Sequence, residues 1–323
     1  SDQQPRDLFR RIGISEPEIS KYIQARAIRQ DGLQKKRARE EGSTDLLKDA
    51  ANIFKELNEN HKTNENDEKK LFSYYTRMNH AFCLLSTNLK KEASEALQIY
   101  SDIENEYPDF LLVKMRLSQA YEKNKLLDLC LKKCDEAYKI YLNIEADGFS
   151  PSDELPEADF KHIRTYLAKI YGYFLWLKSE TINKKNNGSG VEKVKILKKA
   201  YHLTEEALET STEKEALYNN LMYYALDMIK LSEEHPKINV NKTIKDSVES
   251  NLNKIDLNKI NNINLLDTLA KVYDYLGKYK ERDKIIKKLI PIAEESLSEQ
   301  DCDKEILEAV IAEAKAMQDR EEG

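Results

Sequence analysis

Residues that interrupt helices and strands are scarce in this sequence. Nine glycines and seven prolines occur among 323 residues, about 5%, whereas soluble proteins average roughly 12% for the two together. Between turn-like polar clusters, segments of roughly 15–25 residues carry apolar side chains at helical spacing. None shows sustained apolar alternation rich in Val, Ile and Thr. The sequence therefore predicts an all-α protein with long helices and essentially no strand.

The predicted helices form pairs along the chain. Two leading helices precede five pairs, in each of which a short polar connection joins a first helix to a second. A last, acidic helix carries a single apolar stripe, as a cap over a stacked array would need. In order, the helices are expected at residues 16–40, 44–60, 68–88, 90–106, 109–124, 126–145, 157–183, 191–210, 213–234, 240–255, 262–276, 278–298 and 302–320.

A chain of this length usually divides into domains unless it is built from stacked repeats, because compact cores stop growing near about 250–300 residues. A repeat is present. Ala96 and Tyr100 are followed 34 residues later by Cys130 and Cys134, which fill the same positions of a helix. Residues 262–290 add the pattern L-x-x-L-A-x-x-Y-x-x-x-G-x-Y.

These features resemble the tetratricopeptide repeat, a pair of antiparallel helices with a period of 34 residues. The resemblance covers about residues 68–298. It implies a right-handed α-solenoid of antiparallel helix pairs, with N-terminal helices and a C-terminal capping helix. Three later intervals exceed the period by 16, 20 and 14 residues, so insertions are expected in the polar connections near residues 147–156, 186–190 and 232–241. We expect two parts: a basic helical segment, 1–42, and the repeat domain, 43–323.

No catalytic constellation is recognisable, so we expect a protein that is not an enzyme and that uses no cofactor or metal. The pair Cys130-x-x-x-Cys134 could suggest a zinc site, but both cysteines occupy inter-helix packing positions of the repeat. The segment Asn187–Gly190 precedes a helix but lacks the Gly-Lys-Ser/Thr ending of a phosphate-binding loop, which favours a flexible connection.

Location is predicted from apolar runs and cysteine content. No run of 18 apolar residues occurs, which argues against a membrane span. Four cysteines without the dense pairing of secreted domains, Cys83, Cys130, Cys134 and Cys302, indicate reduced thiols and a cytoplasmic protein. The chain begins at Ser1 rather than at methionine, which suggests a fragment of a larger protein.

Charge is unevenly distributed. The formal net charge of −6 argues against a generic nucleic-acid-binding protein, yet residues 1–40 carry ten basic and six acidic side chains. Their sharpest cluster consists of Lys35, Lys36, Arg37 and Arg39. It is either a solvated helix end whose cations oppose the helix dipole or a patch that contacts phosphate. Nucleic acid is therefore an expected partner only through residues 21–39.

The resemblance also places a binding surface. In tetratricopeptide arrays the first helices of successive pairs line a concave surface that receives an extended peptide or a helix of a partner. Positions two residues before and after the central leucine of each first helix should face it, with a few neighbours beside them. Here they are Met115, Arg116, Gln119, Thr165, Lys169, Asn219, Asn220, Tyr223, Asp267, Lys271 and Tyr275. This mixture of amides, tyrosines and both charge signs suits hydrogen bonding to a peptide.

Aromatic residues raise a related question. Trp176 lies in a run, Tyr171–Leu177, that is apolar on every side, so it is either buried from two directions or partly presented to a partner. Most tyrosines occupy packing positions of the repeat. Those that do not are Tyr75, Tyr223, Tyr224 and Tyr275.

The sequence thus predicts a scaffold that binds a partner protein or peptide through the concave face of a tetratricopeptide-like array. An alternative from another class is a regulatory or sensor subunit whose basic N-terminal helix contacts nucleic acid or an effector enzyme domain. No membrane partner is expected.

Overall fold

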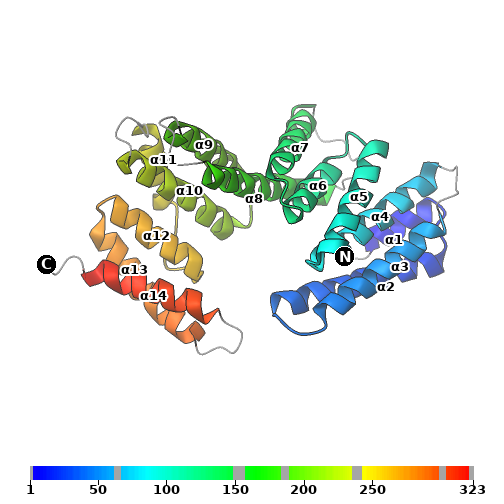
Figure 1. The fold of residues 1–323 in the computed structure, drawn as a ribbon, viewed down its shortest axis with the longest axis horizontal. Helices are drawn as coiled ribbons and strands as arrows, with labels where there is room; N and C mark the ends of the chain where they lie inside the picture. Colours follow the sequence, from blue (N-terminus) through cyan, green and yellow to red (C-terminus); the bar gives the residue numbers. More distant parts are fainter. Residues whose placement is uncertain are drawn as a thin grey trace. The chain divides into compact units, whose positions relative to one another are not determined.

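The computed structural model describes residues 3–61, 67–147, 157–182, 189–234, 242–297 and 303–319. Within these ranges the protein contains 14 α-helices and no strand, which confirms the all-α prediction (Figure 1). All thirteen expected helices are present, with ends within a few residues of those expected. Tertiary contacts divide the chain into two compact units, Ser1–Asp159 and Phe160–Gly323.

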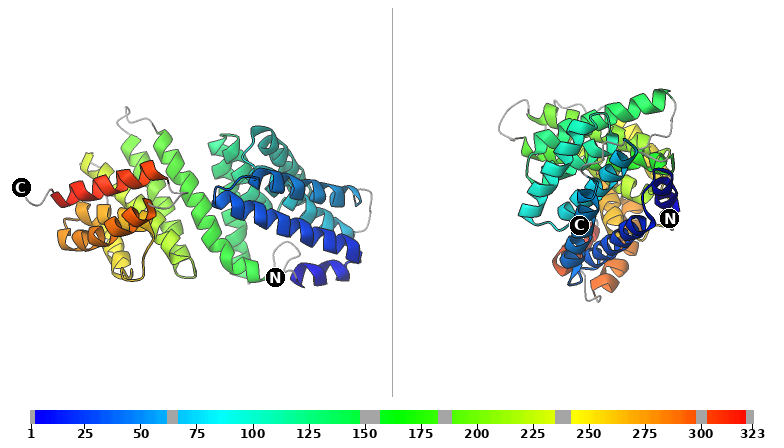
Figure 2. Two further views of the ribbon diagram at one scale, coloured as in Figure 1. Left: turned by 90° about the horizontal axis from the view of Figure 1, so that it is seen from below. Right: turned by 90° about the vertical axis from the view of Figure 1, so that its right-hand side faces the viewer.

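The first unit is built of helices that pack mainly on their neighbours in sequence. They are α1 (Gln3–Arg11), α2 (Glu16–Arg37), α3 (Ser43–Glu59), α4 (Asp67–Ser86), α5 (Lys90–Glu106), α6 (Leu111–Lys123) and α7 (Leu127–Asp147). From α2 onward, successive helices lie side by side as antiparallel partners (Figure 2). In addition, α4 contacts both α2 and α6, so the first helices of successive pairs adjoin.

An aromatic cluster holds the start of this unit together. The ring of Phe9 on α1 lies 4.9 Å from the rings of both Tyr22 on α2 and Phe72 on α4, in edge-to-face geometry. Tyr22 in turn meets the ring of Phe54 on α3 at 5.4 Å. Because α1 and α2 contribute to this core, these two helices fold together with α3 and α4. The expected boundary at residue 42 stays a prediction.

Helix α1 is the element that the sequence analysis missed. Its nine residues include Pro5 and too few apolar side chains to show a helical period. The helix is held instead by burial of Phe9, which is 1% exposed, against residues more than 60 positions away. A contact at that sequence distance leaves no local signal.

The second unit follows the same plan. Its helices are α8 (Glu157–Thr181), which begins just before the division, α9 (Ser189–Leu208), α10 (Lys214–Glu234), α11 (Lys242–Asn253), α12 (Ile263–Tyr275), α13 (Tyr279–Leu297) and α14 (Lys304–Asp319). Contacts join α9 to α10, α10 to α12, α12 to α13 and α13 to α14. The small residues expected where helices approach closely are buried, namely Ala168, Ala200 and Ala270.

Local sequence signals account for the turns that join these helices. The side chain of Asn262 accepts a hydrogen bond from the Leu265 amide at 3.0 Å and caps the start of α12. Gly277 adopts a φ of 67° in the turn between α12 and α13, a left-handed conformation that favours glycine. Both ends of this first helix are thus specified by adjacent residues.

Candidate functional site

Exposed aromatic side chains gather on the first helices of the second unit. Tyr173 on α8, Tyr223 on α10 and Tyr275 on α12 are 42%, 40% and 39% exposed. Trp176 is half-buried, and its ring centroid lies 6.0 Å from that of Tyr173 and 5.6 Å from that of Tyr223. Tyrosine and tryptophan side chains that neighbours support but solvent still reaches are typical of protein interfaces.

Charged side chains complete this surface. Lys271 on α12 donates to Asp267 Oδ2 at 2.9 Å and lies equally close to Glu313 Oε2 of α14. The ammonium of Lys230 lies 5.5 Å from the ring centroid of Tyr275. Burial opposes the charge of Lys271, yet its two carboxylate partners raise the pKa of this lysine. We call the set Tyr173, Trp176, Tyr223, Asp267, Lys271 and Tyr275 the aromatic face.

Two carboxylates of this region are poorly solvated. The indole Nε1 of Trp176 donates to Asp227 Oδ2 at 3.0 Å, and burial raises the pKa of Asp227 more than this bond lowers it. Burial likewise raises the pKa of Asp267, although Lys271 opposes the change. Oδ1 of Asp267 is buried and has no hydrogen-bond partner among the described residues. Both acids therefore hold their negative charge at some cost to stability.

We expect Asp227→Asn to stabilise the second unit at neutral pH by up to about 1 kcal/mol. The folded state binds a proton at Asp227 more tightly than the unfolded chain does. The stability that this protonated carboxyl group contributes is therefore lost as pH rises from about 4 through the folded-state pKa of Asp227. Asparagine keeps the acceptor for the indole. Urea unfolding followed by the emission of Trp176, the single tryptophan, should separate variant from wild type at pH 7 but not at pH 3. The exposed Asp246→Asn on α11 is the matched control, with no such change expected.

The structure places the other predicted residues of the second unit in varied settings. Thr165 is buried, and Lys169 pairs with Glu213 just before α10. Asn219 accepts a hydrogen bond from Thr268 at 3.0 Å, and Asn220 is half-buried. Tyr223, Asp267 and Lys271 are close enough to interact electrostatically, since both charges act on the pKa of Tyr223. These three and Tyr275 form the part of the predicted set that α10 and α12 bring together.

The predicted residues of the first unit form a separate group on α6. Met115 is 1% exposed and contributes to packing. Arg116 donates to Gln119 at 2.9 Å, and its guanidinium lies 4.4 Å from the ring centroid of Phe82 on α4. Of the three, Arg116 and Gln119 are half-buried and reach solvent.

The basic cluster at the end of α2 is divided between two environments. Lys36 donates to the carbonyl oxygen of Ser86, the last residue of α4, where a cation is favoured by the helix dipole. Arg37 and Arg39 are exposed, and Lys35 is half-buried. Lys36 thus faces α4 and differs from the solvated cations beside it.

A polar groove of about 790 Å³ lies over α3, α4 and α5, and sequence reasoning did not predict it. Burial, reinforced by Lys55, lowers the pKa of His80 in this groove to about 4, so the imidazole is neutral at physiological pH. His61 contacts Glu18 through Nε2 at 2.8 Å. The other charged side chains of the groove carry both signs, and some pair with each other, as Arg77 does with Glu106. They do not indicate one chemical class of ligand.

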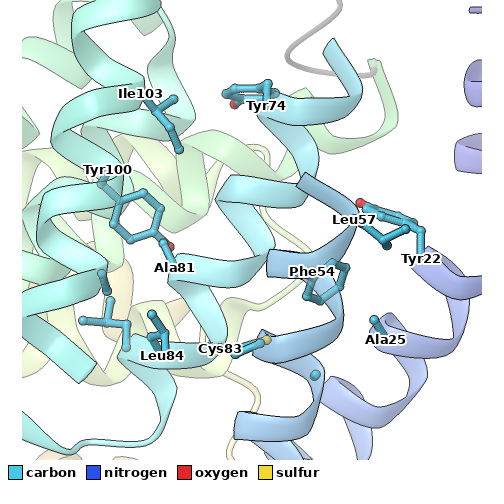
Figure 3. Packing of buried hydrophobic residues seen from close by; sticks show 14 of the residues in the cluster. Tyr22, Ala25, Phe54, Leu57, Tyr74, Ala81, Cys83, Leu84, Tyr100 and Ile103 are labelled. Atoms are coloured by element: carbon cyan, nitrogen blue, oxygen red, sulfur yellow. The ribbon is translucent and has the colours of Figure 1, made fainter. Parts of the chain in front are cut away.

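The three cysteines in the described part of the chain are packing residues. Cys83, Cys130 and Cys134 are buried, and burial raises the pKa of each thiol to about 12. Figure 3 shows the Cys83 sulfur beside Phe54 of the neighbouring helix. In the described ranges no three His, Cys, Asp or Glu side chains are grouped as metal ligands would be.

Some sequence features lie outside the described residues, namely Asn187 with Gly188, Cys302, and most of the three predicted insertions. The helices of the described ranges include none with the length and apolar character needed to cross a membrane.

Sequence reasoning also missed residues of the candidate site. Asp227, Lys230 and Glu313 lie beside the aromatic face, yet none occupies the position expected to face a ligand. Tyr224 was expected to lie outside the packing positions but is 3% exposed, because it packs on Gly172, where an added Cβ would lie 2.8 Å from the tyrosine hydroxyl. Only the small residue at position 172, next to Tyr171, could have indicated this close approach.

Comparisons with known proteins give little further guidance. No family model matches the chain, and no curated protein matches it. Among solved structures, a chain from the complex described as "Structure of Naa15/Naa10 bound to HypK-THB" is similar over 93% of this chain, with 12% sequence identity and a TM-score of 0.44. This chain spans about half, 51%, of that protein's length. A likeness this distant carries no argument about function.

Proposed function

We propose that the protein is a scaffold that binds a segment of a partner protein along the aromatic face of its second unit. The observation that carries the proposal is the placing of Tyr223 and Tyr275 beside the Asp267–Lys271 ion pair, on adjoining first helices. The helix pairs resemble tetratricopeptide repeats, and we propose that the chain belongs to that family. A role in binding a partner is consistent with this resemblance.

Preorganisation supports the proposal. Trp176 is fixed by its bond to Asp227, Tyr223 by its edge-to-face contact with Trp176, and Lys271 by two carboxylates. Ordering a flexible side chain at an interface costs about 0.5–1.5 kcal/mol, so side chains that are already held lower the cost of binding. Tyrosine side chains and charged groups held in this way can contact the backbone and side chains of a peptide.

A displayed random peptide library, selected on the wild-type chain, tests the proposal. Peptides that bind the aromatic face should change the emission of Trp176 on titration. Their affinity should fall at least about tenfold for the folded double variant Tyr223→Ala, Lys271→Glu. Tyr279→Ala is the matched control. Tyr279 is a similarly exposed tyrosine, 47%, but it lies on α13, the second helix of the pair whose first helix, α12, carries Lys271. Selected peptides whose affinity is the same for wild type and the double variant would remove this surface from the function.

The regulatory alternative rests on the exposed cations at the end of α2. Removing residues 1–40 would expose the core around Phe9 and Tyr22, so the test uses the triple variant Lys35→Gln, Arg37→Gln, Arg39→Gln instead. Affinity for a labelled oligonucleotide, measured at two salt concentrations, should fall in this variant, and the salt dependence should weaken. Unchanged affinity and salt dependence would exclude the patch. A non-enzymatic role and a cytoplasmic location remain predictions.

A further inference from the structure

Arg29 on α2 is a cation that has no neutralising partner among the residues the structure describes. Its Nη1 donates to Oδ1 of Asn79 on α4, and its guanidinium lies 5.5 Å from the ring centroid of Phe82. Nε is buried and has no hydrogen-bond partner, and among the described residues no carboxylate forms an ion pair with this side chain. A partly buried guanidinium is usually paired with an anion, because desolvating an unpaired charge costs free energy.

The guanidinium is held in place despite this cost. Asn79, whose oxygen accepts from Arg29, donates through Nδ2 to the Tyr22 hydroxyl at 2.9 Å and to the Tyr75 carbonyl at 2.7 Å. Tyr22 is 3% exposed and belongs to the aromatic core. The position of Arg29 is therefore fixed by a network that extends into the core, and its Nη2 makes no hydrogen bond among the described residues.

Lys36 repeats this situation two turns further along α2. It donates to the Ser86 carbonyl, and in the described part of the chain no carboxylate contacts it. Seven residues separate Arg29 from Lys36, which places them on one side of the helix about 10 Å apart. Both adjoin α4, so they face the same strip of surface.

Cations on the neighbouring helix add to the same field. Arg116 on α6 lies over the Phe82 ring that Arg29 also contacts, and Lys123 on α6 acts on Lys36. Burial, together with the nearby Arg26 and Arg116, lowers the pKa of Arg29, and burial with Lys123 lowers that of Lys36. Cations from α2 and α6 thus concentrate positive potential over α4 in a protein whose overall charge is negative.

We propose that this surface of α2, α4 and α6 binds an internal acidic segment of a partner protein, whose side-chain carboxylates pair with Arg29 and Lys36. It is a second site, on the first unit, and does not depend on the aromatic face. Carboxylates bind guanidinium groups through charge-assisted hydrogen bonds, and one that approaches the Nη atoms would give the Arg29 cation an anionic partner.

The geometry favours this occupant over two others. A single C-terminal carboxylate cannot reach two cations about 10 Å apart. Side chains three residues apart in a segment with polyproline-II conformation can, because they lie on one side of the segment, about 9 Å apart at about 3.1 Å per residue. Proteins bind single-stranded nucleic acid through aromatic rings that stack on the bases. Here the guanidinium groups of Arg29 and Arg116 both lie over the Phe82 ring, which disfavours stacking of a base on it.

The test uses the full chain with the aromatic face disabled by Tyr223→Ala and Lys271→Glu, so that the two proposals fail separately. Peptides selected on it from a displayed random 12-residue library are resynthesised with amidated C-termini, and their affinities are measured by fluorescence anisotropy. We expect recovered peptides to carry at least two Asp or Glu residues. Adding Arg29→Gln should weaken binding about tenfold or more, and so should replacing those acids with Gln or Asn.

Arg37→Gln is the matched control, because it removes the same charge from an exposed position on the same helix. It should weaken binding less than about threefold if contact with Arg29, rather than overall charge, holds the peptide. The proposal is overturned if no acidic peptide is recovered, if both arginine variants weaken binding equally, or if labelled oligo(dT) of 12 nucleotides binds more tightly than the acidic peptides and depends on Arg29.

Discussion

Ala270→Asp is expected to destabilise the second unit by about 3–5 kcal/mol while leaving the first unit folded. Ala270 is completely buried on α12, the helix that contacts α10, α13 and α14. A carboxylate at this position would be desolvated and would separate helices that approach over a methyl group. In a stack of helix pairs each pair is stabilised mainly by its neighbours, so damage should spread from α12 and weaken with distance.

Hydrogen exchange measured by mass spectrometry tests this expectation. Helices α10, α12, α13 and α14 should lose protection in the variant, whereas α2 to α6 should exchange as in the wild type. Ala312→Asp provides the control, since Ala312 is exposed on α14 and the same charge there should cost little. Equal loss of protection in both units would contradict the modular description.

The fold could be predicted from the sequence because its helices are specified by residues close together in the chain. Helix periodicity, the Asn262 cap and the Gly277 turn are all encoded within one or two turns of the chain, so α12 could be predicted nearly to the residue. Packing positions were also predictable, since the 34-residue repeat relates Cys130 to Ala96 and both are fully buried. Helix α1 escaped because nothing within nine residues reveals that Phe9 has a distant partner.

The candidate sites likewise contain some residues that the sequence could identify and others that it could not. Tyr223 and Tyr275 could be singled out because they fall outside the packing positions of a recognisable repeat. The bond between Trp176 and Asp227 joins residues 51 positions apart, and the one between Arg29 and Asn79 joins residues 50 apart. Such pairs depend on how one helix is rotated against the next, which the period alone does not determine. Charge clusters in sequence pointed to residues 35–39, whereas the unneutralised arginine lies further back on α2.

Arg282→Met is expected to lower the free energy of unfolding of the second unit by about 3 kcal/mol. Arg282 on α13 is 1% exposed, and it donates to Asp274 at 2.7 Å and to Asp283 at 2.9 Å. Its guanidinium also lies 5.0 Å from the ring centroid of Tyr279. Methionine keeps much of the packing volume but leaves two carboxylates close together without their cation.

A second substitution in this variant separates charge from packing. Replacing Asp274 by Asn in the variant should restore part of the loss at pH 7. The exposed Lys284→Met on the same helix removes one positive charge as well and should cost little. A loss for Arg282→Met that Asp274→Asn does not relieve would mean that Arg282 stabilises the unit through its contacts with Tyr279 and the helix rather than through its charge.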